Sequence, residues 1–148
     1  MEHGKDMQPA VLQVQNLRIC FQTTAGKLRA VRGVDFTLHK GETLAIVGES
    51  GSGKSVSARA IAGMMSENEK IEEGSILYTC EKEGSTVTED ILKFSRKRRE
   101  KELYGKKIAM VFQDPMTALN PLLTIETQLT EGIRTVSYTH LTLPTIRL

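Results

Sequence analysis

The chain has 148 residues, of which 39% are hydrophobic and 26% charged, and its formal net charge is +2 at pH 7. This length suits one globular domain with a single core, and the small net charge points to no particular class of partner. The apolar runs are too short for a membrane-spanning helix, so any association with a membrane is expected to depend on a partner protein.

The first ten residues form a polar leader that carries Glu2, Lys5 and Asp6. Because the leader contains no apolar stretch of the kind that secretion requires, no signal peptide is expected. Cys20 and Cys80 belong to no CxxC pair and no His-rich cluster. This favours two reduced structural thiols in a cytosolic protein.

Apolar and polar side chains alternate over residues 11–17, which predicts a half-buried strand. A turn at 23–27 separates it from two further strand segments, 28–34 and 34–38. The apolar run 44–47 then predicts a short buried strand. A helix is predicted directly after the glycine-rich stretch that follows, over 56–65.

The second half of the chain is more polar. An acidic loop is predicted over 66–73, a short strand over 74–78 and a polar surface excursion over 81–90. A basic helix over 94–104 and an apolar strand over 107–112 follow.

Residues 114–123 contain two prolines and are predicted to form a loop, and a helix capped by Thr124 is predicted over 124–134. Strands that alternate with helices indicate an α/β architecture, here with an antiparallel β portion at the N-terminus.

Residues 48–55 fit the pattern G-x-x-x-x-G-K-[ST], between the strand predicted at 44–47 and the following helix. Its glycines allow a tight turn that points successive N–H groups at an anion, and the helix N-terminus adds partial positive charge. In this pattern Lys54 reaches the β- and γ-phosphates and the Ser55 hydroxyl binds Mg²⁺. The alternative is a glycine-rich turn without a ligand. The candidate nucleotide-binding residues are Gly48, Glu49, Ser50, Gly51, Ser52, Gly53, Lys54, Ser55 and Val56.

The run 108–115 is an apolar strand that ends near an acid, a pattern that also describes a Walker B element. A Walker B strand places its Asp on Mg²⁺ directly at the strand end. Here Phe112 and Gln113 intervene, and Asp114 precedes a proline that favours an extended loop. A loop built around Gln113 is the better interpretation.

Residues 48–55 and 111–115 together resemble the ATP-binding subunits of ABC transporters. The continuation over 116–121, and the Glu at position 49, resemble in particular the oligopeptide/dipeptide (and nickel) importer subfamily. The resemblance extends roughly over residues 11–134. It implies a P-loop NTPase (ABC-type) core fragment with an N-terminal antiparallel β portion, and it implies ATP and Mg²⁺ as cofactors.

The resemblance also implies roles for two residues outside the glycine-rich loop. Phe21 matches the aromatic position that stacks on adenine in the family, which any base allows because it offers a π face; an ordinary core aromatic is the alternative. Gln113 matches the glutamine that contacts Mg²⁺ and the attacking water, and its amide can accept and donate. A solvated loop glutamine is the alternative there. Lys54 and Gln113 are the expected catalytic residues, and Ser55 and Gln113 the expected metal contacts.

The partners implied by the resemblance are a second ABC ATPase subunit, transmembrane permease subunits and, indirectly, an extracytoplasmic substrate-binding protein. The protein would then work at the cytoplasmic face of the membrane. The basic run within 93–107 is interpreted as a solvated helix face, with nucleic acid or lipid contact as the alternative; it lacks interleaved aromatics, so no nucleic acid partner is expected. A non-transport ABC ATPase and a non-enzymatic fragment are the competing functions.

No LSGGQ-like run and no Walker B strand with a following Glu appear after Gln113 in these 148 residues. Residues 135–146 contain no Asp, Glu, Lys or Arg, and residues 136–145 look like a translated sequencing adapter. We therefore expect 11–135 to be the N-terminal part of an ABC ATPase domain and 136–148 a non-native tail. Weak ATP binding at most, with negligible turnover, is the expectation for this chain.

Overall fold

The computed structural model describes residues 8–82, 84–112 and 119–136. The chain divides into two compact units, Met1–Lys101 and Glu102–Leu148. The first unit holds a sheet and the helix that follows the glycine-rich loop. The second holds a short irregular stretch and one further helix.

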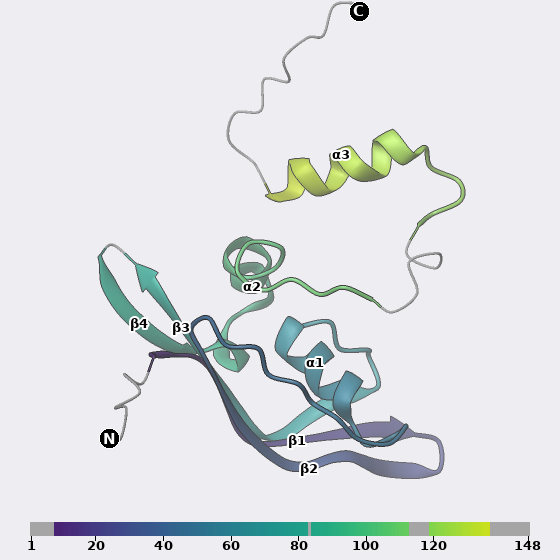
Figure 1. The fold of residues 1–148 in the computed structure, drawn as a ribbon. Coiled ribbons are helices and arrows are strands. Elements are labelled where there is room, and N and C mark those ends of the chain that lie inside the picture. The colour runs from purple at the N-terminus through teal and green to yellow at the C-terminus, as the bar shows by residue number, and fades with distance from the viewer. Residues whose placement is uncertain (1–7, 83, 113–118, 137–148) are drawn as a thin grey trace, which may run out of the picture. The chain divides into compact units, whose positions relative to one another are not determined.

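Four antiparallel strands form the sheet, in the order β2-β1-β3-β4 (Figure 1). The strands are β1 (Ala10–Thr23), β2 (Gly26–His39), β3 (Glu69–Lys82) and β4 (Ser85–Asp90). The predicted antiparallel β portion is therefore confirmed. The two strand segments expected within 28–38 are one continuous strand, because a tight turn at residues 23–26 pairs β2 with β1 along its whole length.

One face of the sheet carries the core. Val14, Leu17 and Ile19 of β1 are at most 1% exposed, as is Ile76 of β3. The helix α1 (Lys54–Ala62) packs on this face with the small buried side chain of Ala60. Small side chains allow close approach of the helix to the strands, so α1 and the sheet share one core.

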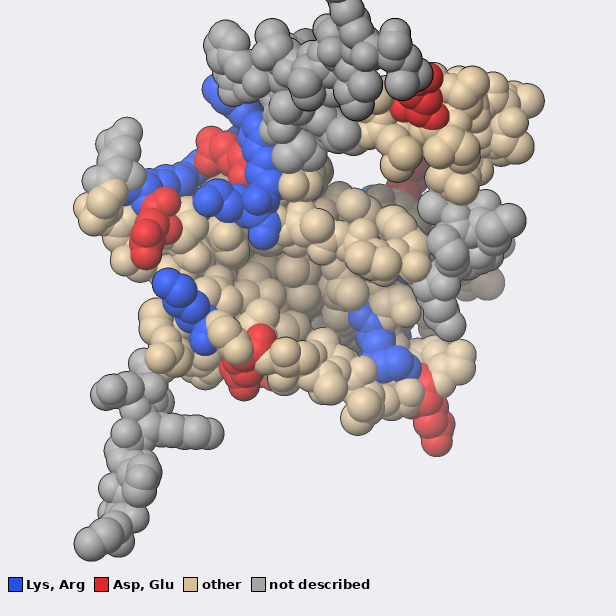
Figure 2. All heavy atoms as spheres, turned by 45° about the horizontal axis from the view of Figure 1, so that its top comes forward, with Lys and Arg blue, Asp and Glu red and all other residues tan. Residues whose placement is uncertain are grey.

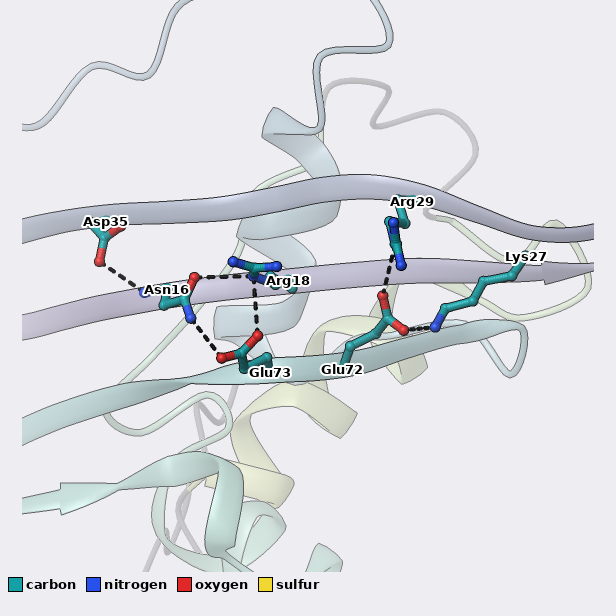
Figure 3. A network of polar contacts seen from close by, with 7 residues as sticks. All are labelled: Asn16, Arg18, Lys27, Arg29, Asp35, Glu72 and Glu73. Carbon is teal, nitrogen blue, oxygen red and sulfur yellow. Dashed lines mark hydrogen bonds and ion pairs between the residues drawn. The ribbon is translucent and has the colours of Figure 1, made fainter.

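The other face carries a network of ion pairs (Figure 3). Arg18 alternates along β1 with buried Leu17 and Ile19, so its side chain points away from the core. Its Nε lies 3.2 Å from Glu73 Oε2 on β3. Glu72 pairs with Lys27 and, at 3.7 Å, with Arg29 of β2. Carboxylates of β3 thus pair with basic residues of both β1 and β2.

A bulge in β1 is fitted to a glycine of β3. The register shifts between Gln15 and Arg18, and Asn16 adopts a positive φ of 45°. Gly74 on β3 has φ 109°, and a Cβ there would lie 2.7 Å from the carbonyl oxygens of Gln15 and Asn16. Real Cβ atoms do not approach backbone this closely, so only glycine fits at position 74.

One prediction for the polar segments was wrong, because residues 69–73, expected in an acidic loop, begin β3. The polar excursion expected over 81–90 is a hairpin, formed by the end of β3 and by β4. Cross-strand polar pairs hold this hairpin: Lys82 Nζ lies 2.7 Å from Glu89 Oε2, and the Thr79 and Thr88 hydroxyls lie 2.9 Å apart. Such pairs stabilise strands whose sequence carries no apolar alternation.

The two apolar segments 44–47 and 107–112, both predicted as strands, form no strand in the structure. Residues 44–47 adopt no strand, and Ile46 and Val47 are 47% and 88% exposed. In the second unit, residues 107–112 contribute one isolated bridge, between Tyr104 and Ile108, and Val111 is 95% exposed. No strand among the described residues pairs with either segment, and a strand forms only where its N–H and C=O groups find a ladder partner.

The helices lie at their predicted positions, with bounds that differ by a few residues. After the 3₁₀ turn η1 (Ile91–Lys93), the basic helix α2 covers Arg96–Glu102, and α3 covers Ile125–Val136. The Thr124 Oγ1 accepts from the Thr127 N–H at 3.2 Å, so the predicted cap of α3 is confirmed. Residues 119–123 are a loop, as predicted, and the rest of the loop predicted over 114–123 lies outside the described residues. No helix in the described part of the chain is long and apolar enough to cross a membrane.

Candidate nucleotide-binding site

The phosphate loop, defined here as residues 48–55, is seated on β2. Gly53 has a left-handed φ of 92° and directly precedes α1. A Cβ at this position would lie 2.9 Å from the Ala30 carbonyl oxygen and 3.1 Å from Val31 Cγ2. Both the conformation and the space therefore require glycine. The close contact ties the loop to the sheet.

The N-terminus of α1 opens at the end of this loop. The helix begins with the hydrogen bond from the Ser57 N–H to the Gly53 carbonyl, at 2.9 Å. No side chain caps it and no acidic residue stands in its first turn. The N–H groups of Lys54, Ser55 and Val56 have no intrahelical acceptor, so they give this end partial positive charge. An oxyanion such as phosphate fits these donors.

Lys54 lies across the loop. Its Nζ donates to the carbonyl oxygens of Gly48 and Glu49, at 2.7 and 2.6 Å, and to Ser52 Oγ at 3.2 Å. The three contacts hold the ammonium group within the loop, where it can neutralise an anion bound to the adjacent N–H groups. The arrangement is therefore suited to a phosphate group.

Ser55 is the exposed hydroxyl at the first turn of α1. No group of three or more His, Cys, Asp or Glu among the described residues could hold a metal ion. Mg²⁺ needs no such group, because it keeps several waters and takes few protein oxygens beside those of phosphate. A single hydroxyl next to a phosphate loop fits that requirement.

Phe21 lies on the same side of the sheet as the phosphate loop. It is half-buried near the end of β1, two residues beyond Ile19. Ile19 pairs with Val31, the residue beneath Gly53. Because side chains two apart on a strand share a face, Phe21 and the loop face the same side. Gln113, the other predicted site residue, lies outside the described residues.

The sequence analysis missed an ion pair beside this site. The Glu69 side chain is fully buried at the start of β3, and it accepts a hydrogen bond from Arg59 Nη2 on α1. It also accepts from the Ser66 N–H at 3.0 Å. Glu69 was assigned to an acidic loop, since nothing in a run of acids distinguishes the one that becomes buried.

Arg96 and Arg98 of α2 contact other groups of the protein itself. Arg98 donates to Glu89 Oε1 at 2.6 Å and stacks on the Phe94 ring at 3.6 Å from its centroid, while Arg96 pairs with Glu100 at 2.9 Å. Hydrogen bonds from Lys82 and Arg98 hold the pKa of Glu89 below its ordinary value. On the face drawn in Figure 2, Lys and Arg side chains lie beside Asp and Glu side chains.

Comparison with known proteins finds one matching family and several similar transport proteins. The family described as "ABC transporter" matches residues 31–145. The dipeptide transport ATP-binding protein DppD of Bacillus subtilis is 47% identical over 124 residues, which cover 83% of this chain and 34% of the relative. The oligopeptide transport ATP-binding protein OppD of the same organism is 46% identical, over 82% of this chain and 32% of the relative.

A third relative is less similar to this chain. The glutathione import ATP-binding protein GsiA of Escherichia coli O157:H7 is 40% identical over 138 residues, which cover 90% of this chain and 21% of the relative. The chain thus spans about a third or less of the length of these curated relatives. Because the family match covers well over half of the sequence, the chain belongs to the ABC transporter family, and its α/β fold is that of an ABC-type P-loop NTPase.

Proposed function

We propose that this chain is the nucleotide-binding part of a subunit that energises peptide import through an ABC transporter by ATP hydrolysis. The observation that carries the proposal is the phosphate loop, where Gly53 sits against β2 and Lys54 lies across the opening of α1. The names of the relatives, which are dipeptide and oligopeptide transport ATP-binding proteins, support peptides as the substrate class.

Each residue of the site has a defined task in this proposal. The N–H groups at the start of α1 and the Lys54 ammonium hold the phosphates and neutralise their charge. The Ser55 hydroxyl holds Mg²⁺, which when bound supplies further charge neutralisation. Phe21 stacks on the adenine, and Gln113 orients the attacking water. Catalysis in this scheme is positioning and electrostatic stabilisation.

The proposal includes the assembly in which the site works. A second ATP-binding subunit completes each nucleotide site, and permease subunits hold the pair at the cytoplasmic face of the membrane. An extracytoplasmic binding protein delivers the peptide. The similarity to named import ATP-binding proteins supports these partners.

A thermal-shift titration of the 148-residue chain with Mg-ATP tests the nucleotide site. We expect the melting temperature to rise with Mg-ATP, because a ligand that binds only the folded state stabilises it. Lys54→Ala should abolish the shift. Lys27→Ala is the matched control, since it removes a lysine from the opposite face and leaves Glu72 paired with Arg29. An unmodified chain that shows no shift, or a Lys54→Ala variant that keeps it, contradicts the proposal.

A further inference from the structure

Glu69 joins three segments of the first unit. One of its carboxylate oxygens accepts from Arg59 of α1, and the other accepts from the Ser66 N–H in the turn after the helix. Glu69 itself begins β3, and its side chain is fully buried. A buried charge is tolerated only when it is paired and hydrogen-bonded, so this carboxylate holds its neighbours in one arrangement.

Glu69 is also the cross-strand neighbour of Phe21. The two residues are directly opposite in the β1–β3 ladder, where side chains on one face meet. The next residue of β1 reinforces the contact, because the Gln22 N–H donates to the Asn68 carbonyl at 2.8 Å. The end of β1 that carries Phe21 is therefore fixed to the segment that carries Glu69.

Two specific contacts hold α1 to the sheet, in addition to the packing of its buried Ala60. Gly53 fixes the start of the helix against β2. Arg59, about one and a half turns beyond Lys54, fixes the middle of the helix to β3 through Glu69. The Arg59–Glu69 pair therefore links the position of α1 to the start of β3, which lies beside Phe21 of β1.

We propose that Arg59 and Glu69 are positioning residues that set the distance between Phe21 and the phosphate loop, and so determine how much the site prefers an adenine nucleotide over a bare polyphosphate. The inference rests on the proposed function. Phosphate binding needs only the loop and the start of α1, which Gly53 holds. Simultaneous stacking of the base needs Phe21 at a fixed place relative to that loop.

Two probes separate these contributions in calorimetric titrations of the 148-residue chain, namely Mg-ATP and Mg-tripolyphosphate. For Glu69→Gln we expect the Kd for ATP to rise about tenfold, within the range that one lost base–aromatic stack explains, and the Kd for tripolyphosphate to change by less than about twofold. Glu73→Gln is the matched control. It removes a carboxylate from the same strand, but one that faces the ion-pair network, and both affinities should stay unchanged.

A double-mutant cycle adds a readout that a merely structural role would not move. In a Phe21→Leu background, Glu69→Gln should weaken ATP binding by less than about twofold, because no aromatic ring remains to be misplaced. If Glu69→Gln does not fold, Arg59→Lys takes its place, because lysine keeps the positive charge but has a different side-chain shape. This variant should also lower the preference for ATP over tripolyphosphate.

Three outcomes would overturn the inference and leave the proposed function standing. Glu69→Gln could lower the affinities for ATP and tripolyphosphate equally, it could lower neither, or its effect on ATP affinity could be fully additive with that of Phe21→Leu. Loss of both probes on Lys54→Ala establishes the phosphate site independently. An unmodified chain that binds neither probe overturns the proposed function and this inference together.

Discussion

Strand β1 and the segment 44–47 are both rich in branched apolar residues, but only β1 forms a strand. In β1, Leu17 and Ile19 are fully buried; Leu17 pairs with Val34 of β2, and Ile19 pairs with residues of both β2 and β3. In the segment 44–47, Ile46 is 47% and Val47 88% exposed, and the backbone makes no ladder. The comparison shows that apolar side chains alone do not make a strand; a hydrogen-bonded neighbour does.

Strand β1 has a paired strand on each side, β2 and β3. β2 follows β1 after a turn of a few residues, so the pair forms from local contacts. β3 joins on the other edge, and its start is fixed by Glu69 and Arg59. A parallel strand, by contrast, needs a crossover connection of a dozen residues or more to bring its partner. The segment 44–47 has the sequence of such a strand.

Truncation of one isoleucine in each region gives the largest expected difference. Ile19→Ala should lower the free energy of unfolding by about 3–4 kcal/mol, because it leaves a cavity in the core. Ile46→Ala should change it by about 0.5 kcal/mol or less, since the side chain is half exposed. Urea denaturation of the two variants provides the measurement. A cost for Ile46→Ala similar to that for Ile19→Ala would show that 44–47 is packed in solution.

The parts of the fold that could be predicted are those with local signals. Alternation located β1, the Thr124 cap located the start of α3, and the glycine spacing located the phosphate loop. The start of β3 could not be found, because its Glu72 and Glu73 are paired with Lys27 and Arg18, residues far away in sequence. The same holds for Glu69, whose burial depends on Arg59 and on no local pattern.

The bulge between β1 and β3 offers a second test of how tightly the paired region is specified. Gly74→Ala should destabilise the fold by about 2–3 kcal/mol, because it combines a strained φ with a clash against the backbone of residues 15–17. The measurement is again urea denaturation.

Gly26→Ala is the matched control for this substitution. Gly26 has a similar φ of 117°, but nothing lies within 4 Å of the added Cβ. Its cost should therefore be that of the strained conformation alone, about 1 kcal/mol. Equal costs at the two positions would mean that the bulge relaxes around the added methyl group, and that the paired region is less rigid than its burial indicates.

The smallest expected effect concerns the hairpin of β3 and β4, where polar pairs replace the apolar core. Hydrogen bonds from Lys82 and Arg98 lower the pKa of Glu89 from its ordinary value of 4.5 in the folded chain. The ionised carboxylate therefore stabilises the fold above that value, and the contribution is lost as the pH falls through the lowered pKa. Glu89→Gln should cost up to about 1 kcal/mol at pH 7, and the difference from the unmodified chain should shrink toward about pH 3.

Urea denaturation at both pH values measures this dependence, with Glu100→Gln as the control. Glu100 pairs with Arg96 within α2 and is 52% exposed, so its loss should cost about 0.5 kcal/mol or less. A penalty for Glu89→Gln that stays constant between the two pH values would show that side-chain packing, rather than the charge of Glu89, holds the hairpin to α2. Packing would then stabilise the polar edge of the sheet, as it stabilises the apolar centre. Backbone pairing alone would then distinguish the paired regions from the unpaired ones.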